Sequence, residues 1–198
     1  MTARPYRQSA RALSVQSTRR RIAEAFFHCW RERWFDEITL EDIAQRAGVS
    51  VRTLMRQFDS KEGLVAGSVS YMAPDIIDRR MVAPGDVGAV IEQLFDDYEL
   101  NGDATIRALA QETRLPALAP LLAAGRAGHR AVTLANFAPR LEAMPQHHRR
   151  RALDALVIAT DVSTWKLLRR DMGRTKAQSQ ATVKMMVDAV LAAYSTAG

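Results

Sequence analysis

The chain has 198 residues, of which 47% are hydrophobic and 25% charged, and it carries a net charge of +6 with a sequence pI near 10.0. No apolar run is long enough to span a bilayer, and the arginine-rich start lacks the apolar core of a signal peptide. The single cysteine, Cys29, excludes an internal disulfide, so we expect a cytoplasmic globular protein.

The first residues are strongly basic. Residues 1–16 are polar, contain Pro5 and show no helical periodicity, so we predict a mobile basic arm. Residues 1–60 hold eleven basic and seven acidic groups, which places +4 of the total +6 in the first third of the chain. Such an excess suits contact with a phosphate backbone, although a solvated basic tail has the same composition.

A first helix is expected from Ser17 or Thr18, and residues 39–58 then read TLEDIAQRAGVSVRTLMRQF. Thr39 and Asp42 have capping-box spacing, which predicts a helix over about 39–47. Gly48 suits a tight turn with left-handed backbone geometry, and Ser50 can cap a further helix over about 50–57. Two short helices joined in this way are typical of a helix-turn-helix, whose second helix reads the DNA major groove.

The flanking residues make this pattern specific. The order F-D-x-x-T-L-x-D-I-A-x-x-A-G-V-S, then R-T-L-x-x-x-F-x-S-K-E-x-L, resembles the TetR (tetracycline repressor) family of bacterial regulators over about residues 17–65. Two positions depart from the family pattern, because Trp34 stands where a glycine is usual and Met55 where a tyrosine is common. The resemblance implies a DNA-binding domain over 17–64 and an effector-binding and dimerisation domain over 65–198.

Candidate DNA contacts follow from the motif and from the resemblance. Arginine can pair with guanine, and a valine or methionine can pack on a thymine methyl. By resemblance, Thr53, Arg56 and Lys61 fall at phosphate contacts, and Val51, Arg52 and Met55 fall nearest the base edges. The full predicted set is Thr39, Ser50, Val51, Arg52, Thr53, Met55, Arg56 and Lys61.

The rest of the chain reads as helical throughout, so the predicted fold is all-α with about nine helices. Asp86 caps one helix, Asn101-Gly102-Asp103 is expected to end it, and a single regular helix is expected through residues 153–168. Thr175 and Gln178 form a capping box for the last helix. The apolar stripes of the last two helices predict a homodimer interface made of Leu156, Thr160, Leu167, Val187, Val190 and Leu191.

The middle helices supply aromatic side chains and few inward-facing ionisable groups. By resemblance they enclose a pocket for a largely apolar small-molecule effector, for which the candidate lining residues are Phe95, Tyr98, Phe137 and Trp165. These side chains read equally well as ordinary core.

Catalytic and metal sites have no support in the sequence. The carboxylates are scattered, His28 and His129 are single helical histidines, and neither a nucleophile elbow nor a phosphate loop is present. We therefore expect no enzyme, no cofactor and no metal. The resemblance implies instead a homodimeric transcriptional regulator, most simply a repressor, that binds a near-palindromic operator and is released by a small-molecule effector. Two alternatives stay open: a constitutive DNA binder that acts through a protein partner, and a small all-α enzyme with an incidental helix-turn-helix.

Overall fold

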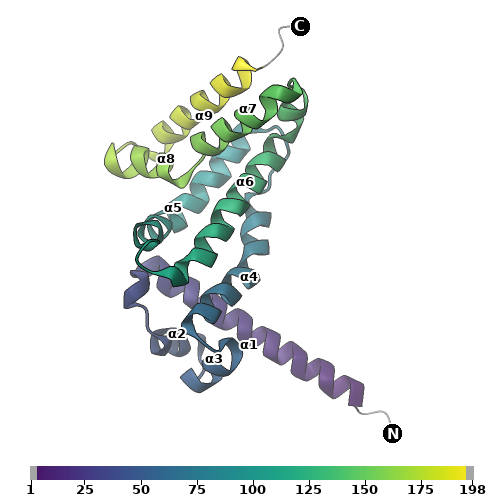
Figure 1. Ribbon diagram of the computed structural model, residues 1–198, viewed down its shortest axis with the longest axis vertical. Helices are drawn as coiled ribbons and strands as arrows, with labels where there is room; N and C mark the ends of the chain where they lie inside the picture. The colour runs from purple at the N-terminus through teal and green to yellow at the C-terminus, as the bar shows by residue number, and fades with distance from the viewer. Residues whose placement is uncertain (1–3, 195–198) are drawn as a thin grey trace.

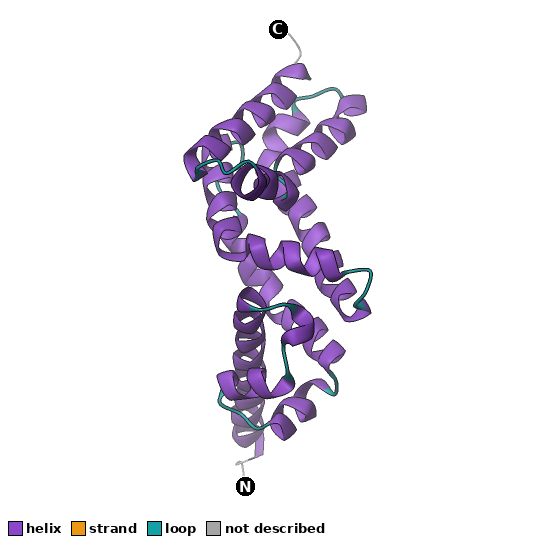
Figure 2. Ribbon diagram, turned by 90° about the vertical axis from the view of Figure 1, so that its left-hand side faces the viewer, coloured by secondary structure: helices purple, strands orange, loops and turns teal. Residues whose placement is uncertain are grey.

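The computed structural model describes residues 4–194, with side chains from residue 13 onward, and all regular structure in that range is helical (Figure 2). The predicted all-α fold is confirmed. The elements are α1 (Arg4–Glu32), a 3-10 turn η1 (Phe35–Glu37), α2 (Leu40–Ala47), α3 (Val51–Phe58), α4 (Lys61–Arg80), α5 (Val87–Gln111), a 3-10 turn η2 (Pro116–Leu118), α6 (Ala119–Glu142), α7 (Gln146–Ala159), α8 (Val162–Lys166), a π-helical turn η3 (Leu167–Asp171) and α9 (Lys176–Ala193). No helix among residues 4–194 is long and apolar enough to cross a membrane.

The molecule is elongated, with α1 to α3 at one end and α7 to α9 at the other (Figure 1). We call α1, η1, α2, α3 and the first turns of α4 the head, and α5 to α9 the body. Helix α4 connects the two, because its first turns pack in the head and its last turn reaches the body. The predicted boundary between residues 64 and 65 therefore falls inside this helix.

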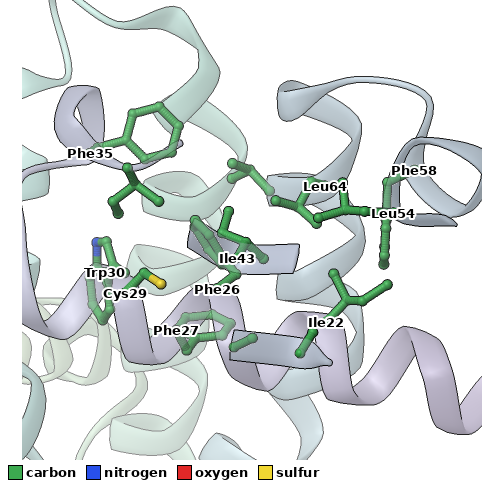
Figure 3. Close-up of a cluster of buried hydrophobic side chains, with 14 of the residues drawn as sticks. Ile22, Phe26, Phe27, Cys29, Trp30, Phe35, Ile43, Leu54, Phe58 and Leu64 are labelled. Atoms are coloured by element: carbon green, nitrogen blue, oxygen red, sulfur yellow. The ribbon is translucent and has the colours of Figure 1, made fainter. Parts of the chain in front are cut away.

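The head is built around an apolar core, to which one face of α1 contributes. Ile22 and Phe26 of α1 meet Ile43 of α2 and Leu54 of α3, and all four side chains are fully buried (Figure 3). The rings of Phe26 and Phe35 lie edge to face, with their centroids 6.4 Å apart. This core fixes α3 against α1 and leaves the opposite side of α3 exposed.

The start of α1 differs from the prediction. The helix begins at Arg4 and not at Ser17 or Thr18, and Pro5 is accommodated because a first-turn residue has no helical hydrogen bond to lose. The first half of α1 projects beyond α2 and α3 (Figure 1). Residues 1–3, and the side chains of Arg4, Arg7 and Arg11, lie outside what the structure describes, so DNA contacts by the arm stay a prediction.

Helix α5 runs unbroken through the Asn101-Gly102-Asp103 stretch that was expected to end it. Gly102 serves packing instead of a turn, because a Cβ there would lie 2.5 Å from the Trp165 ring. The α-helix expected through residues 153–168 is likewise wrong, because α7 ends at Ala159. Thr160 closes α7 and Asp161 caps α8 by accepting a hydrogen bond from the Ser163 N–H.

Candidate nucleic-acid interface

The turn between α2 and α3 has the geometry that the sequence predicts. The Thr39 hydroxyl accepts the Asp42 N–H at 3.1 Å, and the Asp42 carboxylate accepts the Thr39 N–H at 3.0 Å. Gly48 has φ +64°, a left-handed conformation that glycine adopts without strain. The Ser50 hydroxyl accepts the Thr53 N–H at 3.1 Å and so caps α3. Both caps and the turn are confirmed.

Helix α3 has one buried face and one charged exposed face. Leu54 and Phe58 anchor it in the head core, while Arg52 and Arg56 are exposed. Within the described part of the chain, neither arginine has an acidic partner, so both guanidinium groups are available to a ligand. A guanidinium with unused N–H groups matches phosphate oxygens and guanine edges.

The other candidate contact residues of α3 are less exposed than Arg52 and Arg56. Val51 and Met55 are half-buried and pack against the head core, and Thr53 is also half-buried, with its hydroxyl 3.0 Å from that of Ser50. Thr39 is exposed at the start of α2. The structure thus brings the predicted contact residues of α2 and α3 to one side of the head, and their roles toward DNA remain predictions.

Several other basic groups of the head form internal contacts. Arg19 donates to the side-chain and backbone oxygens of Gln57, each at 3.0 Å, and so fastens α1 to the last turn of α3. Arg46 pairs with both carboxylate oxygens of Glu32 at 2.8 Å, and Arg20 pairs with Glu24 and Asp75. Some of the basic residues of this region therefore hold the helices of the head together and are not free to contact phosphate.

Lys61 is also engaged within the protein. Its ammonium donates to the carbonyl oxygens of Phe35 at 3.1 Å and of Ile38 at 2.7 Å, and burial lowers its pKa. A phosphate contact by Lys61 would compete with these two bonds. That role stays a prediction, and the structure shows a second role that the sequence did not suggest.

In the body, the four candidate effector residues are packed as core. Phe95, Tyr98, Phe137 and Trp165 are at most 4% exposed. The Tyr98 hydroxyl donates to the Thr160 carbonyl at 3.0 Å, and the Trp165 indole N–H donates to Glu99 at 3.1 Å. Their polar atoms are satisfied by the protein itself, and a role of these side chains in binding an effector stays a prediction.

A small cavity of about 10 Å³ lies between α4, α5, α6 and α7, and polar side chains surround it. This volume holds about one water molecule. Its walls combine apolar with polar groups: Val90, Leu94, Val132, Arg80, His129, Thr133, Asn136 and Thr160.

The polar groups beside this cavity are buried and have partners within the protein. Arg80 pairs with Asp97, and the side chains of the two are 15% and 5% exposed. Burial lowers the pKa of His129, whose Nε2 donates to the Val157 carbonyl at 3.2 Å. Asn136, which is 1% exposed, donates to the Arg80 carbonyl at 3.0 Å. The sequence did not reveal these contacts because their side chains are isolated polar residues on three different helices.

The candidate dimer residues divide into two groups. Leu156, Thr160, Val187 and Leu191 are already buried within a single chain, which leaves little of their surface for a partner, and their role in an interface stays a prediction. Leu167 is 52% exposed and Val190 is half-buried. Two side chains that the prediction omitted, Ile158 of α7 and Met185 of α9, are 66% and 65% exposed.

Comparison with known proteins agrees with the geometry of the head. Residues 22–67 match the model of a family described as bacterial regulatory proteins, tetR family. Residues 22–67 therefore form a helix-turn-helix domain of the TetR type. Over 74 residues the chain is 32% identical to the HTH-type transcriptional regulator AlkX of Mycobacterium tuberculosis, an alignment that covers 37% of this chain and 33% of that protein.

Solved structures resemble the chain over most of its length. A tetR-family transcriptional regulator from Streptomyces coelicolor superposes with a TM-score of 0.72 at 17% identity, over 90% of this chain and 82% of that one. A transcriptional regulator from Rhodococcus sp. Rha1 gives a TM-score of 0.67 at 16% identity, over 91% of this chain and 99% of that one. At such identities the likeness establishes the fold of the body but not its ligand.

Proposed function

We propose that this protein is a homodimeric transcriptional repressor of the TetR family that binds a near-palindromic DNA operator and is released by a small-molecule effector. The observation that carries the DNA-binding part is the exposed face of α3, where Arg52 and Arg56 have no acidic partner in the described chain. Two copies related by a twofold axis would present two α3 helices to successive major grooves.

DNA binding is tested by selecting duplexes from a random library and measuring affinity for the selected sequence and for a shuffled one. We expect a palindromic selected sequence and a steep loss of affinity with salt. Arg52→Ala should weaken binding to the selected sequence by about 1–3 kcal/mol, with little effect on the shuffled one. Arg151→Ala, an exposed arginine of α7, is the control and should change neither affinity. If Arg52→Ala lowered the affinity for both sequences equally, Arg52 would not be a residue that reads bases.

Dimerisation would use the exposed apolar side chains of α7, η3 and α9. Ile158, Leu167 and Met185 are each more than half exposed, and covering them on a partner would remove this apolar surface from water. Met185→Glu should shift sedimentation equilibrium toward monomer, because a carboxylate in an apolar interface loses its hydration. Leu13→Glu, on an equally exposed leucine of α1, should leave the dimer intact. A monomeric wild-type protein at micromolar concentration would contradict the proposal.

The effector would enter at the cavity bordered by Arg80, His129 and Asn136. The cavity holds about one water molecule, so the surrounding helices would have to move apart for a mainly apolar molecule to lie against Val90, Leu94 and Val132. One or two hydrogen bonds to the polar groups would orient it. Such a molecule should raise the melting temperature and lower operator affinity. The small size of the cavity also suits the alternative of a constitutive DNA binder. A broad library without any stabilising compound would favour that alternative.

A further inference from the structure

The connector η1 joins α1 to α2, and both backbone polar groups of its first residue are held by side chains from outside the helix-turn-helix. The Phe35 N–H donates to the Gln111 side-chain oxygen at 3.1 Å, and the Phe35 carbonyl accepts from Lys61 at 3.1 Å. Gln111 lies at the end of α5 and Lys61 at the start of α4. Phe35 itself is 4% exposed, and the Lys61 ammonium lies 4.4 Å from the centre of its ring. We call Gln111, Lys61 and the Phe35 peptide groups the connector clamp.

Further contacts fix the orientation of Gln111. Its amide nitrogen donates to the Asp36 carboxylate at 2.6 Å, so its oxygen must face the Phe35 N–H. Arg114 donates to the other Asp36 oxygen at 2.8 Å. Gln111 is 2% exposed, and a buried amide that uses both its oxygen and its nitrogen in this way has little freedom to rotate. The end of α5 is therefore rigidly attached to the connector.

The helices that form the clamp are also tied together at the cavity. Arg80, at the end of α4, pairs with Asp97 in the middle of α5. Asp97 and Gln111 are separated by about 21 Å along α5, and Lys61 and Arg80 by about 29 Å along α4, at about 1.5 Å per residue. Helices α4 and α5 thus both run from the cavity to the connector (Figure 1). Side chains link the two helices through the Arg80–Asp97 pair at the cavity, and Lys61 and Gln111 both bind Phe35 at the connector.

We propose that Gln111 and Lys61 are positioning residues for operator binding, because the connector clamp holds the connector, and with it the helix-turn-helix, in one orientation relative to α4 and α5. This inference rests on the proposed function, because it concerns how a dimer presents two α3 helices at a fixed separation. Neither residue need touch DNA. A cleft of about 590 Å³ borders the clamp beside Phe35, Asp36 and Lys61, so the connector has free space on that side when the clamp is loosened.

The first test substitutes Gln111 by a side chain of similar volume that forms neither hydrogen bond. Gln111→Met should lower affinity for the selected operator by about tenfold, the order expected when two buried hydrogen bonds are lost, and should leave affinity for shuffled DNA unchanged. Gln93→Met is the matched control, because Gln93 is a half-buried glutamine of the same helix. It should leave both affinities unchanged. An unchanged operator affinity for Gln111→Met, or equal losses on both DNAs, would overturn the proposal.

Lys61 provides a second test. Binding to the operator requires a fixed orientation of the head, whereas binding to shuffled DNA does not. If Lys61 acts through the clamp, Lys61→Met should therefore lower affinity for the operator and leave affinity for shuffled DNA unchanged. A phosphate-contacting lysine would instead weaken both and reduce the slope of log affinity against log salt by about one. Weaker binding to both DNAs together with a smaller salt slope would show that Lys61 contacts phosphate and would contradict its role in the clamp.

The third test measures the clamp without DNA. Nitroxide labels at Gln45→Cys in α2 and Leu100→Cys in α5, both exposed positions, report the distance between head and body in a Cys29→Ala background. Labelled protein is diluted into excess unlabelled protein, so that pairs within one chain dominate. Gln111→Met should broaden the distance distribution relative to wild type and to Gln93→Met, and an identical distribution would overturn the clamp. Failure of the wild-type protein to select any operator would refute the proposed function while leaving this measurement valid.

Discussion

Replacing Gly102 with alanine should destabilise the protein even though alanine is the better helix former. A Cβ at this position would lie 2.5, 2.6 and 2.9 Å from three carbons of the Trp165 ring. The ring has no room to retreat, because Trp165 is 1% exposed, its N–H is bonded to Glu99, and the Arg170 guanidinium lies 4.5 Å from its centre.

The expected magnitude comes from two opposing effects. Overpacking a well-filled core costs about 1–3 kcal/mol. Replacing glycine with alanine inside a helix returns about 1 kcal/mol. Gly102→Ala should therefore lower the free energy of unfolding by up to about 2 kcal/mol. Gly125 of α6 is the control, because a Cβ there meets no atom within 4 Å. Gly125→Ala should raise the free energy of unfolding by about 0.5–1 kcal/mol.

Urea unfolding followed by circular dichroism at one protein concentration measures both variants. A fixed concentration is needed because association shifts the apparent stability. Opposite signs for the two variants are expected. If Gly102→Ala stabilised the protein as much as Gly125→Ala, the reasoning from the Trp165 contact would be refuted.

Three further predictions concern the buried polar groups of the body and the α3 cap. Burial lowers the pKa of His129, so as the pH falls below 6.5 the unfolded chain takes up this proton more readily than the folded chain does. The contribution of His129 to the free energy of unfolding should therefore be fully present above pH 6.5 and should be lost as the pH falls below that value. In melting curves at several pH values, His129→Gln should flatten this dependence, whereas His147→Gln, at an exposed site, should not. Asp97→Ala should lower the free energy of unfolding in urea by about 3–5 kcal/mol, because it leaves Arg80 buried and unpaired. The control is Asp154→Ala, whose ion pair is about half exposed, and it should lower the same free energy by about 1 kcal/mol or less. Ser50→Ala should cost about 1 kcal/mol through the lost cap, and a stability equal to wild type would show that the Thr53 N–H finds another partner.

The helix-turn-helix was predicted to within about a residue because local chemistry determines it. Thr39, Asp42 and Ser50 form caps with neighbours three residues away, and Gly48 meets a backbone requirement that glycine satisfies best. Such signals are complete in a short stretch of sequence. The exposed arginines of α3 could be placed for the same reason.

The predictions for the body were less accurate because they depend on contacts between distant segments. Gly102 looked like a helix end, although its partner is a tryptophan more than sixty residues later. An apolar stripe on a helix does not distinguish core from interface, so the sequence could not show that Leu156 and Val187 are buried within a single chain. The clamp residue Gln111 carried no sequence signal, since its partners lie in the connector between α1 and α2.

The separation of the two cores bears on how such a chain can change over evolutionary time. Apart from Ala104, Ala108, Leu118 and Leu122, the buried residues of the head core lie between residues 22 and 65, and the body core draws on residues 90–191. Substitutions that reshape the body therefore leave most head contacts untouched, provided that these few bordering positions are kept. This explains why the family match covers only residues 22–67 while solved structures share the whole fold at 16–17% identity. Side chains of the body can therefore change without disturbing the packing that orients α3.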